Sequence, residues 1–382
     1  MATHYERMVA HLRPDGPAPP NLELILPNET WWVEHFDYLK EHGYVMRPRY
    51  RPGWKPSYKL GTHEFLERED GQALDNPIMD AIRSSDSLMV AIKRVKTSSS
   101  EVQVGTLFSN DEHASNPSNH CIRILEVLSV PETADEVLLV MPWLREVDSP
   151  SFRTIGEILQ FTKEMIEGLQ YMHKSNVAHR DCSINNMAMD AKTMYPHQYH
   201  PRAPERRYDW TGRVHHRSRT HRPPRYYLID FGFSQKYDPS QPRPLEYAIK
   251  SGGYLPPEGA AVIPCDPFAT DVFLLGNMVR TSFLDGDHGL SYPGVDGLEF
   301  LRPLVNDMIV DDPSKRPTMD EVASRFSIIT KTLSSWELRS RAARKNEFPL
   351  LKPFRAIHHL LWTTSMMLLL KPAIPTPTKS PS

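Results

Sequence analysis

Three short segments carry residue types that chemistry on a phosphate group requires. Residues 179–181 read His-Arg-Asp and are followed by Asn186, residues 230–232 read Asp-Phe-Gly, and Lys93 ends the apolar run 89–93. A triphosphate is strongly anionic, so a site that handles it needs a cation, oxygen ligands for a divalent metal, and an oxygen base. Each segment alone is a weak signal, because a strand lysine is usually solvated and Asp-Phe-Gly is usually a turn. Their order along the chain is the informative feature.

The order Val-Ala-Ile-Lys, then His-Arg-Asp with Asn186, then Asp-Phe-Gly resembles the eukaryotic protein kinase superfamily. The resemblance implies an α+β, two-lobed fold with a small β-rich N-terminal lobe and a larger, mainly helical C-terminal lobe, and it implies ATP and Mg²⁺ as cofactors. By position, Lys93 would contact the α and β phosphates, and Asp181 would orient the substrate hydroxyl and accept its proton. Asp230 and Asn186 would hold the metal ions.

Two downstream segments extend the resemblance. Residues 251–258 are similar to the end of a kinase activation segment, and residues 311–317 are similar to the segment whose arginine pairs with its glutamate. We therefore expect a buried ion pair between Glu258 and Arg316. Small-molecule phosphotransferases normally lack this apparatus, so the resemblance implies a protein substrate. Ser251 stands near the place of a threonine found in serine/threonine kinases, which slightly favours that branch over tyrosine kinases.

The adenine of ATP is expected beside residues 141–144, which read Met-Pro-Trp-Leu. Met141 is the expected gatekeeper, and Ala91 on the lysine strand is expected to line the same site. Pro142 offers only its carbonyl because it has no N–H group, so the backbone of Leu144 matters more for nucleotide binding.

Two glutamates could pair with Lys93. Glu101 is near in sequence and lies in an amphipathic helical pattern, whereas Glu112 has a more usual separation but polar neighbours. We favour Glu101 and keep Glu112 as the alternative. Arg180 is expected to recognise an acidic or phosphorylated activation segment. The candidate phosphorylation sites are the hydroxyls of Tyr237, Ser240 and Tyr247.

Two departures from the family pattern keep a second hypothesis open, a catalytically impaired pseudokinase that binds nucleotide or acts as a scaffold. No Gly-x-Gly-x-x-Gly precedes Lys93, and the nearest upstream glycines are Gly61 and Gly71. Ser183 stands where serine/threonine kinases usually have a lysine that reaches the γ-phosphate. We favour an active kinase, because pseudokinases often lack part of the catalytic set that is complete here.

An arginine-rich insert, residues 191–225, replaces what is normally a tight turn. Its eight arginines are accompanied by only two acidic residues, Glu205 and Asp209. Interleaved aromatic residues could make it an arm that binds RNA or an acidic protein. We favour a solvated, partly ordered loop instead. Its histidines have no accompanying cysteine and no regular spacing, so we expect no metal site there.

Proline-rich stretches and apolar patterns divide the chain into four predicted parts. These are a proline-rich extension with a short helical arm at 28–43 (1–74), an N-terminal lobe (75–144), a C-terminal lobe containing the insert (145–337) and a tail (338–382). The arm is expected to pack on the main domain. Together with the departures above, Trp31-Trp32 and residues 47–54 resemble a divergent group of fungal protein-kinase-like proteins.

Local patterns predict several elements of the two lobes. Alternating apolar residues predict a hairpin of strands 78–82 and 88–95 around the turn 84–87, and further strands at 122–130 and 137–144. Thr154 and Glu157 have the spacing of a capping box, which predicts a helix from there to His173.

The overall composition excludes a polyelectrolyte, since the net charge is -2 and 24% of the residues are charged. Cys121, Cys182 and Cys265 have neither disulfide-framework nor metal-ligand spacing, which favours a reducing compartment. The first thirty residues lack an apolar run. We therefore expect a cytoplasmic or nuclear protein.

The tail contains the one membrane candidate of the sequence. The apolar segment 356–370 is interrupted by His358 and His359 and is too short to span a bilayer. Flanking Arg355 and Lys371 would suit an amphipathic helix on a membrane surface. We favour docking of this segment onto the chain's own body. The expected partners are thus ATP and a protein substrate, with the insert and the tail as weak candidates for nucleic-acid or membrane contact.

Overall fold

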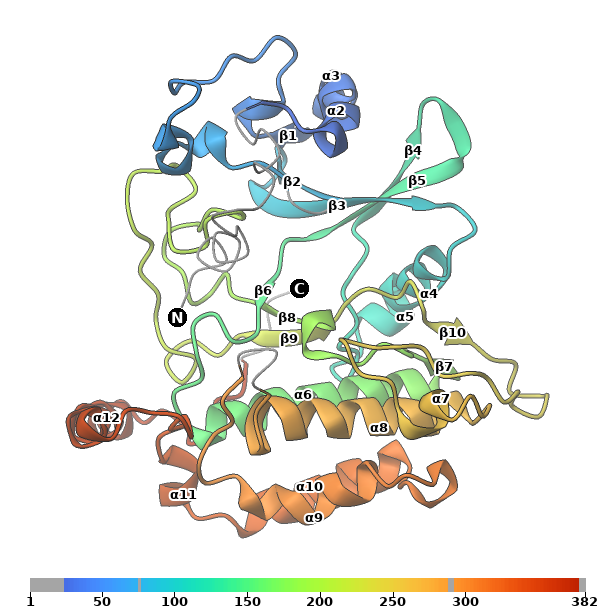
Figure 1. Ribbon diagram of the computed structural model, residues 1–382, viewed down its shortest axis with the longest axis vertical. Helices are drawn as coiled ribbons and strands as arrows, with labels where there is room; N and C mark the ends of the chain where they lie inside the picture. The colour runs from blue at the N-terminus through green and yellow to red at the C-terminus, as the bar shows by residue number, and fades with distance from the viewer. Residues whose placement is uncertain (1–23, 75–76, 288–291, 378–382) are drawn as a thin grey trace. The chain divides into compact units, whose positions relative to one another are not determined.

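The computed structural model describes residues 24–74, 77–287 and 292–377 (Figure 1). By packing, the described residues form two compact units. The first comprises residues 24–74, 77–97, 124–143 and 195–216, and the second comprises 98–123, 144–194, 217–287 and 292–377. The first is rich in strands and the second is mainly helical. The predicted α+β class, with a β-rich and a mainly helical part, is confirmed.

The first unit is built on a five-stranded antiparallel sheet with the order β1-β2-β3-β5-β4. Its strands are β1 (Tyr44–Met46), β2 (Ile78–Arg83), β3 (Leu88–Lys96), β4 (Glu126–Val130) and β5 (Thr133–Pro142). The predicted hairpin is the β2–β3 pair, with Ile78 opposite Lys93. The strand predicted from residue 122 begins only at Glu126, and the strand predicted to reach Leu144 ends at Pro142.

Two short helices cover this sheet, α2 (Pro27–Glu34) and α3 (Phe36–Glu41). The prediction of one continuous helix over 28–43 is therefore wrong, because two separate helices form there. His35 lies between them, with its ring stacked on Trp31 at 3.8 Å between centroids. Trp32, Phe36 and Leu39 are buried in one core with residues of the sheet, as the packed arm predicts. Gly43, at φ +85°, ends the second helix in the left-handed region that favours glycine.

The segment between β1 and β2 consists of three short 3-10 helices and connecting loops. These are η1 (Pro48–Tyr50), η2 (His63–Glu67) and η3 (Glu69–Gly71). Arg47 and Arg49 are fully buried in it and pair with Asp80 and Glu29. Such pairs are stable only when both charges are well hydrogen-bonded, because burial strips them of water. Two buried ion pairs thus hold the segment to β2, which carries Asp80, and to α2, which carries Glu29.

The outer part of the insert, Tyr195–His216, belongs to the first unit. His200 is fully buried, and its Nε2 lies 3.4 Å from Oε1 of Glu69. Burial lowers the pKa of His200 below its usual value. The indole N–H of Trp210 donates to the carbonyl of Glu67 at 2.7 Å. The interpretation of the insert as a solvated loop is therefore wrong, because it packs against the segment between β1 and β2.

The second unit contains two small sheets, β6-β8-β9 and β7-β10, among helices (Figure 1). Its strands are β6 (Arg145–Glu146), β7 (Val177–Ala178), β8 (Met187–Asp190), β9 (Arg225–Leu228) and β10 (Gln235–Lys236). Its helices include α4 (Ser100–Ser109), α5 (Asp111–Ala114), α6 (Ile155–Lys174), α7 (Pro257–Ala260), α8 (Pro267–Val279), α9 (Arg302–Met308), α10 (Met319–Thr332), α11 (Ser335–Arg339) and α12 (Lys352–Leu368). Short 3-10 turns, η4 (Ile184–Asn186), η6 (Glu299–Leu301), η7 (Pro313–Lys315) and η8 (Pro349–Leu351), and a π-helical turn, η5 (Arg280–Leu284), connect them.

Helix α6 begins where predicted, but its capping differs. The side chain of Thr154 accepts the N–H of Glu157 at 3.1 Å. The carboxylate of Glu157 does not complete a capping box; it binds the backbone N–H of Arg153 and both the N–H and hydroxyl of Thr220. Glu157 thus ties the base of the insert to the start of α6. This role could not be read from the local pattern, because Thr220 is remote in sequence.

The base of the insert is held by a second buried residue. Arg219 donates to the hydroxyl of Tyr226 at 3.0 Å and to the carbonyls of Pro150 and Val147. Its guanidinium also lies 4.4 Å from the ring centroid of Phe152.

Within the described residues, no helix combines the length and hydropathy needed to cross a membrane.

Candidate functional site

The loop that carries Asp181 is held by a buried carboxylate on another element. Asp271, fully buried on α8, accepts the backbone N–H groups of His179 and Arg180 at 2.7 and 2.6 Å and lies 3.0 Å from Nε2 of His173. Hydrogen bonds to an ionised acceptor are stronger than neutral ones. They hold Arg180 at φ +69°, a left-handed conformation that is unusual for a residue with a Cβ atom.

Asp181 and Asn186 are joined through the same loop. The side-chain amide of Asn186 donates to the carbonyl of Asp181 at 3.0 Å. The Oδ1 atom of Asp181 is buried and has no hydrogen-bond partner among the described residues. A buried, unpaired acceptor is costly, and such atoms are often completed by a ligand. The oxygen therefore retains an unused capacity to accept a hydrogen bond, which a donor could reach only if the surface above it opens.

Asp230 is brought to Asn186 by strand pairing. In the antiparallel β8–β9 pair, Met187 lies opposite Leu228. Asn186, just before β8, and Asp230, just after β9, therefore lie at the same end of the pair. The N–H of Ile229 donates to the carbonyl of Asn186 at 3.0 Å. The predicted metal residues Asn186 and Asp230 thus occupy neighbouring backbone positions in the second unit.

Glu101 is positioned toward the Asp-Phe-Gly segment. The hydroxyl of Ser100, at the start of α4, lies within hydrogen-bonding distance of the carbonyls of Phe231 and Gly232, 3.0 and 2.9 Å away. Glu101 is buried, and a Cβ atom placed on Gly232 would lie 4.0 Å from its Oε2. The rival Glu112 is exposed on α5. The choice of Glu101 as the partner of Lys93 stays a prediction.

The first unit carries the predicted nucleotide residues of the sheet. Ala91 on β3 pairs directly with Met141 on β5, and both are buried. Lys93 lies two residues further along β3, opposite Leu139. Leu144 lies beyond the end of β5 and belongs to the second unit. The nucleotide-binding roles of these residues stay predictions.

Arg180 pairs with an acidic residue of the segment that follows Asp-Phe-Gly. Its Nη2 lies 2.8 Å from Oε2 of Glu246, whose Oε1 accepts the hydroxyl of Tyr237 at 3.0 Å. Burial, with Glu246 nearby, raises the pKa of Tyr237. Of the three candidate phosphorylation sites, Tyr237 is buried, whereas Ser240 and Tyr247 are exposed. The expectation that Arg180 meets an acidic segment therefore fits the structure.

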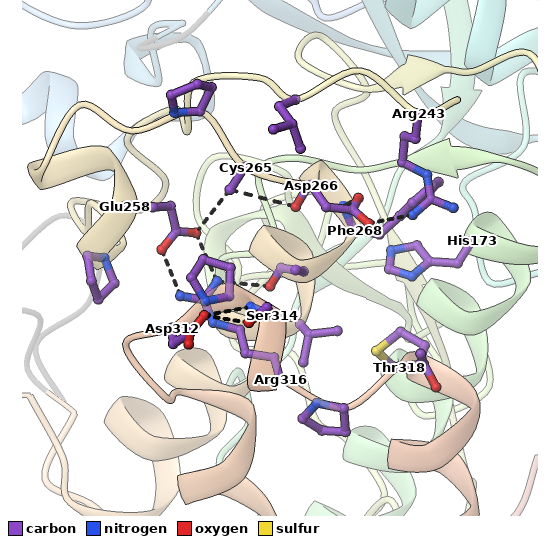
Figure 2. Close-up of a pocket in the computed structure, with 18 of the residues that line it drawn as sticks. His173, Arg243, Glu258, Cys265, Asp266, Phe268, Asp312, Ser314, Arg316 and Thr318 are labelled. Carbon is purple, nitrogen blue, oxygen red and sulfur yellow. Dashed lines mark hydrogen bonds and ion pairs between the residues drawn. The ribbon is translucent and has the colours of Figure 1, made fainter. Parts of the chain in front are cut away.

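The predicted pair of Glu258 and Arg316 is formed and buried (Figure 2). Two guanidinium nitrogens of Arg316 donate to the two carboxylate oxygens at 2.8 and 2.7 Å, and Thr270 adds a third bond. Burial alone would raise the pKa of Glu258, but the bonds from Arg316 outweigh it and the pKa is lowered. A pocket of about 1060 Å³ lies beside the pair, lined also by Arg243 and Phe268.

Residues 251 and 252 pack closely on the loop that carries Asp181 and Ser183. Gly252 has φ +52°, and a Cβ atom there would lie 2.5 Å from the Cβ of Ser183. The hydroxyl of Ser251 is buried and, like Oδ1 of Asp181, has no hydrogen-bond partner within the described ranges. The Ser251 hydroxyl therefore makes no hydrogen bond to the loop that carries Asp181.

Several residues of this arrangement were missed by sequence reasoning. The loop-holding role of Asp271 and the bonds of Ser100 were not predicted. Glu246 carried no signal, because a single glutamate in a polar loop is common. Within the described residues, no three histidine, cysteine or acidic side chains are clustered to hold a metal.

Comparisons with known proteins match this geometry. A family model described as the protein kinase domain matches residues 76–287, more than half of the chain. The chain is also similar to the serine/threonine-protein kinase shk1/pak1 of Schizosaccharomyces pombe, with 27% identity over 124 residues. That match covers 31% of this chain and 18% of the yeast protein, so the similarity spans less than a fifth of that relative.

Proposed function

The chain belongs to the protein kinase family, and from this premise we propose that it transfers the γ-phosphate of ATP to a serine or threonine hydroxyl of a protein. The observation that carries this proposal is the unpartnered Oδ1 of Asp181 in a loop held by buried Asp271. A proton acceptor must present a free oxygen to the incoming hydroxyl, and it must be held in place before the substrate arrives.

The residues near Asp181 suit Mg²⁺. Magnesium prefers oxygen ligands, usually takes only one or two from protein side chains, and fills the rest with phosphates and water. Asp230 and Asn186 would supply those oxygens, which agrees with the lack of a three-residue cluster in the part of the chain that is described. When bound, the metal would neutralise charge on the phosphates.

The other residues act on the nucleotide and the substrate. Lys93 contacts the α and β phosphates, with Glu101 as the partner that orients it. Ala91, Met141 and Leu144 bind the adenine end. Asp181 aligns the substrate hydroxyl and takes its proton as the new phosphate ester forms. Arg180 does not touch the reacting atoms. It positions the activation segment through Glu246.

A protein substrate is supported by the platform at the end of the activation segment. Glu258 is held by Arg316 and Thr270, so the backbone from Ser251 to Glu258 is fixed at one end by a buried pair. A fixed backbone offers a surface along which an extended peptide can lie. The similarity to shk1/pak1 supports a serine/threonine preference.

The second candidate is a pseudokinase that binds partners without transferring phosphate. Two observations favour it: the segment joining β1 to β2 is not a glycine-rich loop, and Ser183 is too short to reach a phosphate. The first weakens nucleotide binding and the second removes a positive charge from the transition state. Both hypotheses share the fold and differ in nucleotide use and transfer.

The experiment that tests nucleotide use is thermal melting of the purified chain with ATP, with and without Mg²⁺, beside Asp230→Asn. We expect a rise of a few degrees that requires the metal and is absent in the variant. If millimolar nucleotide leaves the melting temperature unchanged in the unmodified chain, the pseudokinase hypothesis replaces our proposal. An equal rise in Asp230→Asn would refute the metal assignment.

A further inference from the structure

Helix α12 packs on the second unit through polar side chains. His359 and Thr363 are buried on its inner side, and Nε2 of His359 lies 2.8 Å from the carbonyl of Arg339. Trp362 contacts the same body, with the guanidinium of Arg153 4.6 Å from its ring centroid. Figure 1 shows α12 end-on at the edge of the second unit. Met366 is buried as well, so the inner face of this helix mixes polar and apolar side chains instead of being wholly apolar.

The outer side of α12 is apolar. Phe354, Ile357, Leu361 and Leu368 are 72%, 60%, 68% and 80% exposed. Their spacing of three, four and seven residues places them on one face of a helix. We call these four residues the outward stripe. Leu350 before the helix and Leu370 after it are exposed as well, which lengthens the apolar surface. The segment docks onto the chain's own body as expected from the sequence, through His359, Thr363 and Met366, but the outward stripe stays exposed.

An apolar surface of this kind normally has a partner. Single exposed leucines are common on soluble proteins, but several large apolar side chains on one helix face, here interrupted by exposed Thr364 and Ser365, mark a surface that contacts protein or membrane. The distribution of charge around the stripe indicates which. From Phe348 to the end of the chain there is no aspartate or glutamate, while Lys352, Arg355 and Lys371 lie at the two ends of the helix.

The position of these cations is informative because it is unfavourable for the isolated helix. Lys352 and Arg355 lie in the first turn of α12, where the helix dipole disfavours positive charge. Arg355 pairs with Glu347 at 2.7 Å. Neither Lys352 nor Lys371 has an ion-pair partner among residues 24–74, 77–287 and 292–377. An anionic partner would remove this cost for Lys352, and Lys371 beyond the other end of the helix would be a second contact for the same anionic surface.

We propose that α12 lies on a membrane surface that contains anionic lipids, with the outward stripe in the acyl region and the lysines at the headgroups. A helix with an apolar face, basic residues and too little length to span the bilayer has the features of an interfacial anchor. A second copy of the chain fits less well, because two such helices would bring their cations together with no acidic residue between them. This inference is independent of the proposed kinase activity.

The test is sedimentation of the full chain with vesicles of phosphatidylcholine alone and of phosphatidylcholine with phosphatidylserine. We expect binding to the anionic vesicles, weakened by salt, and little binding to the neutral ones. The double variant Ile357→Asp with Leu361→Asp should abolish it. Ile328→Asp is the matched control, because Ile328 is an apolar residue, 61% exposed, on the distant helix α10.

The lysines supply a graded readout. Replacing Lys352 and Lys371 by glutamine should lower the partition onto anionic vesicles roughly fivefold for each charge removed. All the substituted side chains are on the surface, so the melting temperatures should stay unchanged. Equal binding to both vesicle types, or none to either, would overturn the proposal. A dimer in sedimentation velocity that the double variant abolishes, without vesicle binding, would assign the stripe to a second copy instead.

Discussion

The catalytic loop of the second unit and the segment between β1 and β2 in the first unit both depend on buried charge, but they differ in what is left available. In the loop, Asp271 holds the backbone and Oδ1 of Asp181 remains without a partner in the described chain. In the segment, Arg49 donates to both oxygens of Glu29 and to the carbonyls of Asp70 and Leu24.

This difference distinguishes a loop that could bind a ligand from a segment that only stabilises the fold. Arg47 is bonded in the same way, to both oxygens of Asp80 and to the carbonyl of Gln72. An arginine whose donors are all used inside the protein is not available to a phosphate. Arg47 and Arg49 are therefore not available to replace a glycine-rich lid, and our proposal assigns phosphate and metal binding to Lys93, Asp230 and Asn186.

The largest effect is expected from breaking a buried pair of the first unit. Arg49→Met leaves the carboxylate of Glu29 buried without its partner, so we expect a loss of about 3–5 kcal/mol in the free energy of unfolding. Chemical denaturation would measure it, with exposed Arg51→Met as the control. The double variant with Glu29→Met should lose much less. If Arg49→Met costs no more than Arg51→Met, the segment is not anchored as described.

In the second unit, Asp271→Asn should act on the catalytic loop. Losing the charge weakens the bonds to the N–H groups of His179 and Arg180, and each charge-assisted bond contributes about 1.5–3 kcal/mol. We expect kcat to fall at least tenfold while the KM for ATP changes little, because the loop orients the hydroxyl and not the nucleotide. Steady-state kinetics would show this. A rise in KM alone would contradict the positioning role.

Several elements and contacts of the two units could be predicted from the sequence, and others could not. The β2–β3 hairpin, helix α6, and the pair of Glu258 and Arg316 follow from local patterns or from the family resemblance. Strand β1 was missed because three residues are too few to show an alternating pattern. The packing of His200 on Glu69 was missed because no local pattern signals a partner so distant in the sequence.

The candidate site shows the same limit. Asp181, Asn186 and Asp230 were found because their spacing is regular in the family. Asp271 and Glu246 were not, because each acts through a partner far along the chain. Glu101 was chosen over Glu112 from amphipathicity, and the burial of Glu101 beside Gly232 supports that choice.

A smaller effect is expected from pH through Glu258. Because the folded-state pKa of Glu258 lies below its ordinary value of 4.5, its bonds stabilise the fold above that pH. This contribution is lost as the pH falls through the lower folded-state pKa. Unfolding measured by denaturant from neutral to acidic pH should show the loss, and Arg316→Met should reduce the slope in this window. An unchanged slope would mean that other carboxylates dominate.

The smallest effect should come from Glu246→Gln. The pair with Arg180 is partly exposed, and such pairs contribute roughly 1 kcal/mol or less. We expect at most about a fivefold fall in the transfer rate, with unchanged thermal stability. Replacing exposed Tyr247 by phenylalanine is the control. A loss as large as that of Asp271→Asn would show that Arg180 and Glu246 do more than position the activation segment.

The central claim is that the free oxygen of Asp181 serves phosphoryl transfer. Its most direct test is transfer of labelled phosphate from Mg-ATP to a mixture of serine- and threonine-containing peptides, with Asp181→Asn in parallel. We predict transfer by the unmodified chain and a loss of several orders of magnitude in the variant, which still binds nucleotide. Equal transfer by both proteins, or none by the unmodified chain although it binds Mg-ATP, would contradict the assignment.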